Sequence, residues 1–309
     1  MSEPGAFTHE TSDGKKAAQY RIVAVTNRGG VRSQNEDAIG ISGWAFSGTE
    51  PTALEIAVDG AIPVIVVVAD GMGGHRGGAT ASRLVAESLS KWAPSEPENF
   101  NGEIRTAIAH TSRRLLDDGR TRPELAGMGS TVAGVLLRPD GTGIAFNVGD
   151  SRVYQFNGGY LGQLSVDDRP PAAPGNNGVM TQCLGGGREV RLDPHLFEFD
   201  WSGGDSLLIC SDGLHDVIDD VSMEDAFRTG NPAVAYKLVN KTLALGAPDN
   251  VSVVTIEWAP VPMTRENDSL IPVAEEHQFS TAPWGSVRTA AMPTTHAVAD
   301  EERTKEVRQ

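Results

Sequence analysis

Only two cysteines occur among the 309 residues, and no long apolar run does. Cys183 and Cys210 stand in unrelated contexts, and we interpret both as reduced, mostly buried thiols, since free cysteine behaves as a small apolar residue. Reduced cysteines suit a cytoplasmic protein. The opening MSEPGAFTHETSDGKK has no apolar signal segment, and no apolar run approaches the roughly 18 residues of a membrane span. We therefore expect a cytoplasmic protein without a membrane span.

Clusters of lysine and arginine are also missing, although 22% of the residues are charged. The formal net charge is -15, and the isoelectric point is near 4.9. A nucleic-acid partner needs clustered basic side chains that neutralise phosphates, so the composition argues against one. An acidic surface with a metal site is the better expectation.

The composition divides the chain into three zones. Residues 1–19 are polar without apolar periodicity, which predicts a flexible leader. Residues 20–259 are dense in short apolar segments and predict one domain, consistent with 39% hydrophobic residues. Residues 260–309 are rich in Pro, Thr, Ser and Ala, which is typical of a disordered tail. Alternatively, Phe279 or Trp284 anchors a docking segment in this tail, because exposed aromatic side chains often serve as recognition points.

The apolar segments predict both strands and helices. Segments rich in β-branched residues predict strands at 20–26, 64–69, 130–138, 143–149, 152–156, 206–211 and 251–258. Apolar residues at helical spacing predict helices at 77–92, 101–118 and 231–245, with Pro232 in the first turn of the last. Consecutive strands without a helix between them indicate antiparallel pairing. The predicted class is α+β, with helices packed on antiparallel sheets.

Aspartates stand where these strands begin or end. Asp70 follows VIVVVA, Asp150 follows IAFNVG, Asp212 follows LLICS, Asp249 precedes NVSVVTIEW, and Asp37 lies in RSQNEDAIG. A single Asp-Gly pair is usually no more than a turn. Several carboxylates at the ends of different strands instead indicate a cluster, which would repel itself unless cations lay within it. Ligands that are all oxygen select hard ions such as Mg²⁺ or Mn²⁺.

Six short motifs follow one another along the chain. They are RSQNED at 32–37, VADGMGGH at 68–75, GSTVAG at 129–134, VGDSRVY at 148–154, LLICSDGLHDV at 207–217 and DNVSVV at 249–254. In order and approximate spacing they resemble the bacterial metal-dependent Ser/Thr protein phosphatases of the PPM, or type 2C, family. The resemblance implies a sandwich of two antiparallel β-sheets flanked by helices, with a metal centre at one edge. It also implies hydrolysis of phosphoserine and phosphothreonine by a hydroxide that bridges two metal ions.

The resemblance also implies which residues hold the two ions, Mn²⁺ or Mg²⁺. Asp70 is similar to the carboxylate that bridges them, and Gly71 to the residue that offers a backbone carbonyl to one. Asp212 and Asp249 resemble ligands of the other ion, which Asp37 reaches directly or through water. Asp150 is similar to the acid that binds a third, weaker ion together with Asp212. The alternative role of Asp150 is to cap the turn that follows it.

Other residues of the motifs are assigned roles around this centre. Arg32 resembles the arginine that grips substrate phosphate, since a guanidinium can make two parallel hydrogen bonds to it. Glu36 is expected just outside the metal ligands. Animal members carry a histidine directly after Asp-Gly, where this chain has Met72. His75 comes three residues later, so we favour a role outside the ligands over a catalytic one, and His215 is expected to be structural.

The chain departs from its bacterial relatives in three places. Ala79 stands where many relatives have Glu, and Asp167, Asp168 and Arg169 replace the usual Asp-His-Ser. Only RPPAAPGNNGVM precedes TQCLGG, where relatives carry a longer helical flap. A segment so rich in Pro, Gly and Asn cannot hold two helices, so we expect a shortened flap.

Three functions agree with these features. The first is an active phosphatase that acts on phosphoproteins, reverses a bacterial Ser/Thr kinase and works as a monomer. The second is a phosphatase-like binding or regulatory module with weak catalysis. The third is hydrolysis of small phosphorylated metabolites. Because Asp37, Asp70, Asp212, Asp249 and Arg32 are all present, we favour the first.

Overall fold

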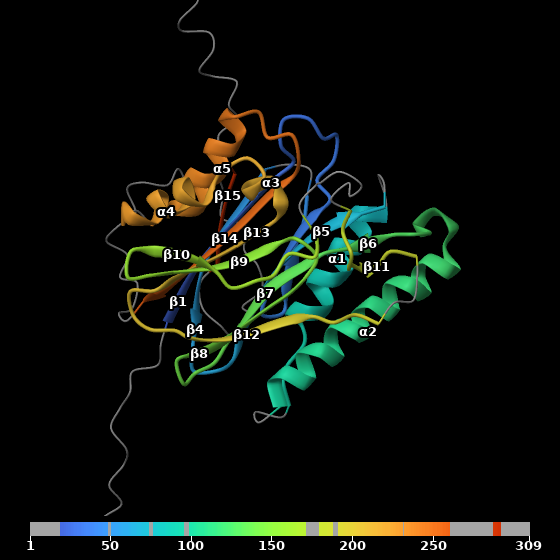
Figure 1. Ribbon diagram of the computed structural model, residues 1–309, viewed down its shortest axis with the longest axis horizontal. Helices are drawn as coiled ribbons and strands as arrows, with labels where there is room; N and C mark the ends of the chain where they lie inside the picture. Colours follow the sequence, from blue (N-terminus) through green and yellow to red (C-terminus); the bar gives the residue numbers. More distant parts are fainter. Residues whose placement is uncertain are drawn as a thin grey trace, which may run out of the picture.

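Two antiparallel β-sheets lie face to face, and helices cover both outer sides of the pair (Figure 1). The computed structural model describes residues 19–48, 51–73, 77–95, 99–170, 179–187, 191–230, 232–259 and 287–291. The predicted α+β class and the predicted sandwich are both confirmed.

The first sheet has seven described strands in the order β10-β9-β13-β14-β1-β4-β15. Their bounds are β1 (Gln19–Asn27), β4 (Thr52–Asp59), β9 (Arg152–Asn157), β10 (Tyr160–Gln163), β13 (Ser206–Cys210), β14 (Val251–Ala259) and β15 (Val287–Ala291). Strand β14 lies at the centre, antiparallel to both β1 and β13. The start of β14 therefore lies beside the end of β13, which brings two acidic segments together.

The second sheet has eight described strands. Their bounds are β2 (Asp37–Ile41), β3 (Trp44–Phe46), β5 (Val64–Met72), β6 (Gly129–Ser130), β7 (Val132–Leu137), β8 (Thr142–Val148), β11 (Leu184–Gly185) and β12 (His195–Asp200). Strand β5 pairs with β2 and with β7, antiparallel to each. This pairing places Asp37, the first residue of β2, directly opposite Asp70 near the end of β5.

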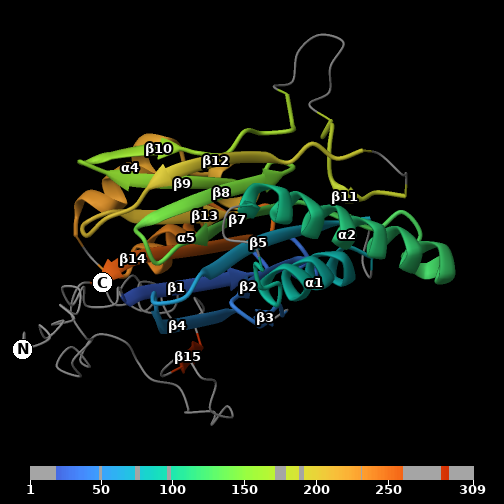
Figure 2. The same ribbon diagram turned by 90° about the horizontal axis from the view of Figure 1, so that it is seen from below.

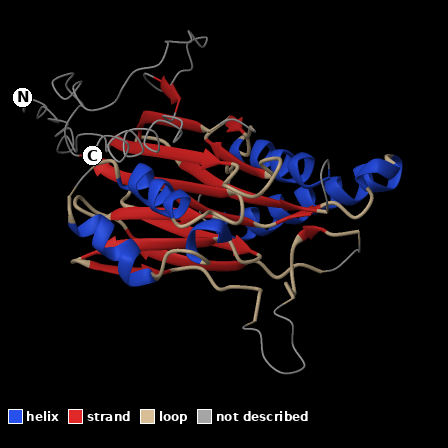
Figure 3. Cartoon of the chain, turned by 90° about the horizontal axis from the view of Figure 1, so that it is seen from above, coloured by secondary structure: helices blue, strands red, loops and turns tan. Residues whose placement is uncertain are grey.

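The helices form one group on each outer side of the sandwich (Figure 3). Helices α1 (Gly77–Ser90) and α2 (Phe100–Thr121) lie side by side over the second sheet (Figure 2). Helices α3 (Asp212–His215), α4 (Asp220–Arg228) and α5 (Val234–Ala244) pack on the first sheet. A 3₁₀ turn, η2 (Pro123–Leu125), follows α2. No helix in the described part of the chain is both long enough and apolar enough to cross a membrane.

Strand β5 illustrates why the apolar runs are continuous rather than alternating. Val64, Val66 and Val68 point into the core between the sheets, whereas Ile65 and Val67 point into the core under α1 and α2. Both faces of the strand are buried, so both carry apolar side chains. Burying such side chains stabilises the fold by about 1.5–3 kcal/mol each.

All seven predicted strands and all three predicted helices overlap observed elements. Helix α5 begins at Val234, so Pro232 precedes the helix instead of occupying its first turn. Ala233 is the N-cap, with an irregular backbone conformation, and this delays the start of the helix. The strands absent from the prediction are β2, β3, β4, β10, β11, β12 and β15, together with the separate strand β6.

Several predicted features fall wholly or partly outside the described residues. These are His75, most of the leader 1–19, most of the tail 260–309, and residues 171–178 of the flap. The flap residues that are described, up to Pro170 and from Val179, contain no helix. Within the tail, which was predicted to be disordered, Val287–Ala291 forms β15 and pairs with β4, so the prediction is wrong for this segment. Pairing of this kind satisfies the backbone groups of an otherwise open sheet edge.

Candidate metal centre

Four aspartates meet at one edge of the sandwich because strand ends of both sheets lie there. Asp37 and Asp70 are paired across β2 and β5 of the second sheet. Asp212 opens α3 shortly after β13, and Asp249 stands two residues before β14, in the first sheet. Each of these four charges acts electrostatically on at least one of the others. The fold therefore brings these four acids close enough to influence one another's charge.

Two glycines allow the chain segments at this edge to approach closely. A Cβ atom on Gly71 would lie 2.1 Å from the carbonyl oxygen of Gly78, at the start of α1. A Cβ atom on Gly213 would lie 1.9 Å from the carbonyl oxygen of Asn250. No side chain fits at such distances, so both positions require glycine. The Asp70-Gly71 and Asp212-Gly213 pairs are thus more than turn signals, because their glycines let the acid-bearing segments pack against other backbone.

The two acids of the second sheet are held in an environment that opposes ionisation. Asp37 is fully buried, and its Oδ2 accepts a hydrogen bond of 2.8 Å from Ser211 Oγ. Burial raises the pKa of Asp37 to about 7, and the charges of Asp212 and Asp249 add to this shift. Burial also raises the pKa of Asp70 well above its usual range, and Asp37 is the largest of the charges that raise it further. A bound cation would favour the ionised forms of both acids.

Unpartnered oxygens test whether the group suits a divalent ion. Asp37 Oδ1 and Asp212 Oδ1 are buried and have no hydrogen-bond partner among the described residues. Such oxygens are costly to bury unless a cation meets them, and carboxylates are the ligands that hard divalent ions prefer. The donor set therefore fits Mg²⁺ or Mn²⁺.

The side chains are nevertheless not gathered around one point. Within the described ranges, no three Asp, Glu, His or Cys side chains are placed to hold an ion together. Two of the acids are turned toward guanidinium groups instead. Arg32 Nη2 lies 2.6 Å from Asp249 Oδ2, and Arg169 Nη1 lies 3.3 Å from Asp212 Oδ2. An ion that binds Asp249 or Asp212 must therefore compete with an arginine.

The loop that carries Arg32 is fixed by a buried amide. Asn250 is 5% exposed, and its Oδ1 accepts a hydrogen bond of 2.8 Å from Glu36 N. Its Nδ2 donates to the carbonyl oxygens of Arg28 and Gln34, each at 2.8 Å. Arg32 lies between these anchors with its side chain 52% exposed, beside the acids and open to solvent. Asn250 belongs to the DNVSVV motif, but its role as an anchor was not predicted from the sequence.

The remaining predicted residues lie around this group. The Glu36 carboxyl group packs against Gly78 at the start of α1, where a Cβ atom would lie 2.8 Å from Glu36 Cδ. Asp150 is 1% exposed; burial raises its pKa to about 6, and Asp212 is the largest charge that adds to the shift. His215 Nε2 lies 3.0 Å from the carbonyl oxygen of Asp150, in keeping with the structural role expected for it.

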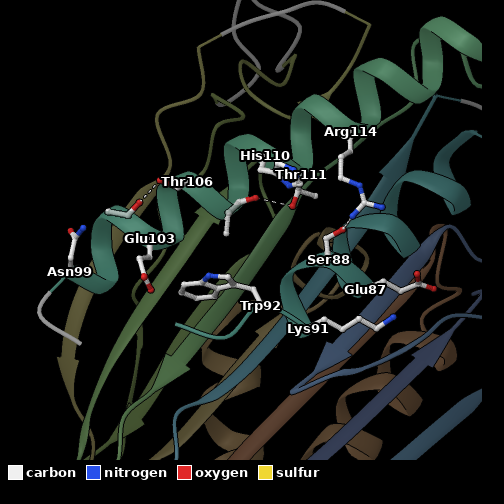
Figure 4. Close-up of a pocket in the computed structure, with 12 residues that line it drawn as sticks. Glu87, Ser88, Lys91, Trp92, Asn99, Glu103, Thr106, His110, Thr111 and Arg114 are labelled. Carbon is white, nitrogen blue, oxygen red and sulfur yellow. Dashed lines mark hydrogen bonds between the residues drawn. The ribbon is translucent and has the colours of Figure 1, made fainter. Parts of the chain in front are cut away.

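A separate open groove of about 820 Å³ runs between α1 and α2 (Figure 4). Its lining includes Glu87, Lys91, Trp92, His110 and Arg114, and none of the clustered aspartates. Both acidic and basic side chains line it, so its charge favours no single class of ligand.

The raised pKa values predict how the metal-free protein responds to pH. Asp37 and Asp150 have folded pKa values of about 7 and about 6, above the usual 3.8. Between pH 5 and 8 the folded state holds protons that the unfolded state has lost, so stability falls as pH rises. Over this interval Asp37 contributes about two pKa units and Asp150 about one, so at about 1.4 kcal/mol for each unit we expect the free energy of unfolding to fall by about 4 kcal/mol.

Urea unfolding in EDTA at several pH values measures how steeply the free energy of unfolding changes with pH. Mn²⁺ should reduce the slope because bound cations stabilise the ionised carboxylates, and it should raise the melting temperature. Asp37→Asn should also reduce the slope in EDTA. If the stability of the metal-free protein is constant or rises between pH 5 and 8, the acids are not clustered as described.

Comparison with known proteins gives consistent matches. A family model described as Protein phosphatase 2C matches residues 53–244. The chain is 30% identical over 254 residues to the serine/threonine protein phosphatase PstP of Mycobacterium tuberculosis, covering 77% of this chain and 45% of PstP. It thus spans less than half the length of that relative. It is 28% identical over 254 residues to the serine/threonine phosphatase stp of Listeria monocytogenes, covering 75% of this chain and 93% of stp.

Solved structures agree with these matches. PppA, described as a key regulatory component of T6SS in Pseudomonas aeruginosa, superimposes with a TM-score of 0.64 at 29% identity. That match covers 79% of this chain and 99% of PppA. The catalytic domain of PstP in complex with two manganese ions gives a TM-score of 0.63 at 29% identity, covering 78% of this chain and 99% of that domain.

Proposed function

The chain belongs to the protein phosphatase 2C family, and we propose that it is a metal-dependent phosphatase that hydrolyses phosphoserine and phosphothreonine in proteins. The observation that carries this proposal is the meeting of Asp37, Asp70, Asp212 and Asp249 at one edge of the sandwich, with Arg32 beside them. Metal-binding carboxylates and a phosphate-binding cation are the two components that phosphoryl transfer to water requires.

We assign the metal ligands from position and chemistry. Asp70 is at the centre of the group, because the charges of Asp37, Asp212, Asp249 and Asp150 all act on it. It is therefore the best candidate for a carboxylate shared by two ions. Asp37, Asp212, Asp249 and the Gly71 carbonyl complete the proposed set. The ions are Mn²⁺ or Mg²⁺, and the two manganese ions bound by the PstP catalytic domain support this choice.

Some residues of the chain would bind the ions, and others would bind the substrate. When bound, the two ions would activate a water molecule for attack on phosphorus and offset charge on the phosphoryl oxygens. Arg32, which is half exposed at the rim, would bind the phosphate of the substrate. Asn250 would keep Arg32 in reach by fixing both ends of its loop.

The substrates we propose are proteins phosphorylated by a bacterial Ser/Thr kinase. Support comes from PstP and stp, which are named as serine/threonine phosphatases. A cytoplasmic location is also part of the proposal, and the free state of Cys183 and Cys210 agrees with it. Comparing phosphoproteomes of a deletion strain and its parent would identify the substrates, as phosphosites that accumulate in the deletion strain.

The test of the proposed function is metal-dependent hydrolysis. The purified chain should release phosphate from a phosphothreonine peptide in Mn²⁺ or Mg²⁺, and excess EDTA should abolish the reaction reversibly. A small phosphorylated metabolite at equal concentration should react more slowly. Activity that persists in EDTA would contradict the proposal. Metal binding without turnover of any phosphopeptide would favour the binding module instead.

A further inference from the structure

Three carboxylates surround the guanidinium group of Arg169. Nε lies 2.9 Å from Asp150 Oδ2, and Nη1 lies 3.3 Å from Asp212 Oδ2. Nη2 lies 2.8 Å from Asp216 Oδ2 and 3.0 Å from Asp216 Oδ1. Each nitrogen of one planar group therefore faces a different acid, and we call these three acids the outer cluster. No other Lys or Arg in the described part of the chain forms an ion pair with them.

The position of Arg169 is fixed by its neighbour in the sequence. The backbone N of Asp168 donates to the carbonyl oxygen of Gly149 at 2.9 Å, and Gly149 N donates to Asp168 Oδ2 at 2.8 Å. Asp168 Oδ1 also accepts a hydrogen bond of 2.9 Å from Gln182 Nε2. These contacts tie the segment before Arg169 to the segment that carries Asp150. The arginine is thus anchored beside the outer cluster and is not a solvent-directed side chain that meets it by chance.

We propose that Arg169 is the built-in cation of the outer cluster and occupies the place where a third metal ion would otherwise bind between Asp150 and Asp212. The inference rests on the proposed function, because it concerns the same centre. A third ion would need the carboxylate oxygens that the guanidinium already faces. It would also meet the positive charge of the guanidinium at close range, and the two cations repel each other.

This proposal replaces the expectation, drawn from resemblance, that Asp150 and Asp212 hold a third ion. Arginine stands at 169 where the resembling proteins have serine, and a serine carries no charge that could neutralise the cluster. The proposal gives the arginine at this position a physical role. A fixed guanidinium keeps a positive charge 2.9 Å from Asp150 Oδ2 at any metal concentration, whereas a weakly bound ion would not. The contact is an ion pair and not a hydrogen bond, since neither carboxylate oxygen of Asp150 has a hydrogen-bond partner among the described residues.

Counting bound manganese tests the proposal without measuring activity. Electron paramagnetic resonance reports free aqueous Mn²⁺, so titration of the full chain gives the number of ions bound per molecule. We expect Arg169→Ala to bind one more ion than the parent protein, and Arg169→Ala/Asp150→Asn to lose that additional ion. Arg169→Lys keeps the positive charge and should bind the same number as the parent. Arg105→Ala removes an exposed arginine paired with Asp193 and controls for the change in net charge.

A second measurement does not require the Arg169 variants to fold. In the parent background, Asp150→Asn should leave the number of bound ions unchanged, since Asp150 is paired with Arg169 and not with metal. The proposal is overturned if Asp150→Asn lowers the count, or if a folded Arg169→Ala binds no additional ion. Both measurements count ions and not turnover. A protein that binds manganese as expected but hydrolyses no phosphopeptide would therefore contradict the proposed function alone.

Discussion

Asp70→Asn is expected to lower kcat by about 1,000-fold or more. Asp70 is proposed to be the one carboxylate shared by both ions, and an amide of the same shape carries no negative charge to hold them together. Loss of Asp37 or Asp249 would remove a ligand from one ion only. Manganese affinity measured by calorimetry should fall in parallel with kcat. The same titration should give parental affinity for Asp59→Asn, which removes an exposed acid at the end of β4, opposite the start of β1.

The stability of the Asp70→Asn variant separates loss of the site from loss of the fold. Burial raises the pKa of Asp70, and repulsion from Asp37, Asp212 and Asp249 raises it further, so the ionised side chain strains the metal-free protein. A neutral amide relieves this repulsion, and the melting temperature in EDTA should rise. An inactive variant with a higher melting temperature would support the assignment. Parental turnover or parental manganese affinity in the variant would contradict it.

Much of the fold could be predicted because its central strands are buried on both faces. Strands such as β5 and β14 are runs of β-branched residues, and a strand between two covered faces needs no polar alternation. Strands β3, β10 and β12 could not be found in this way. Strand β10 is largely exposed and β12 is partly so, and β3 is only three residues long. Their pairing depends on neighbours distant in sequence, which local composition does not reveal.

The acids of the site could be predicted for a related reason. An aspartate directly after an apolar strand is conspicuous, as at Asp70 and Asp212. Their partners were not predictable, because Ser211 Oγ reaches Asp37 across 174 positions of sequence and Asn250 reaches Glu36 across 214. Only the folded chain brings them together. The asparagine in DNVSVV could have indicated such a partner. An amide next to a predicted metal ligand, if it is buried, needs several hydrogen-bond partners.

The contacts of Arg169 were likewise not predictable from the sequence. In the sequence it is one member of an unusual Asp-Asp-Arg triplet, and nothing local connects it with Asp150 or Asp216. The fold connects them through the Asp168 and Gly149 backbone contacts. An unusual residue in a familiar motif can thus mark a position of interest in the sequence. The role of that residue becomes clear only from its contacts in the folded chain.

Arg32→Ala is expected to lower kcat/KM by about 30- to 1,000-fold. The guanidinium is proposed to bind phosphate in the ground state and the transition state, and one charge-assisted contact of this kind is worth roughly 2–4 kcal/mol. Each 1.4 kcal/mol corresponds to about a tenfold change in rate. Arg32→Lys should recover only part of the loss, since an ammonium group cannot make two parallel hydrogen bonds. Steady-state kinetics with a phosphothreonine peptide measures both variants.

Manganese affinity distinguishes Arg32→Ala from a variant that has lost a metal ligand. Arg32 Nη2 lies 2.6 Å from Asp249 Oδ2, so removing the side chain frees a carboxylate that we assign to metal. Manganese affinity in Arg32→Ala should therefore be equal to or higher than that of the parent, opposite to Asp70→Asn. Arg83→Ala, which removes an exposed arginine paired with Glu87 on α1, controls for the lost charge and should keep parental kinetics. Weaker manganese binding in Arg32→Ala would indicate that the arginine supports the metal centre itself, and unchanged kcat/KM would exclude it as the phosphate clamp.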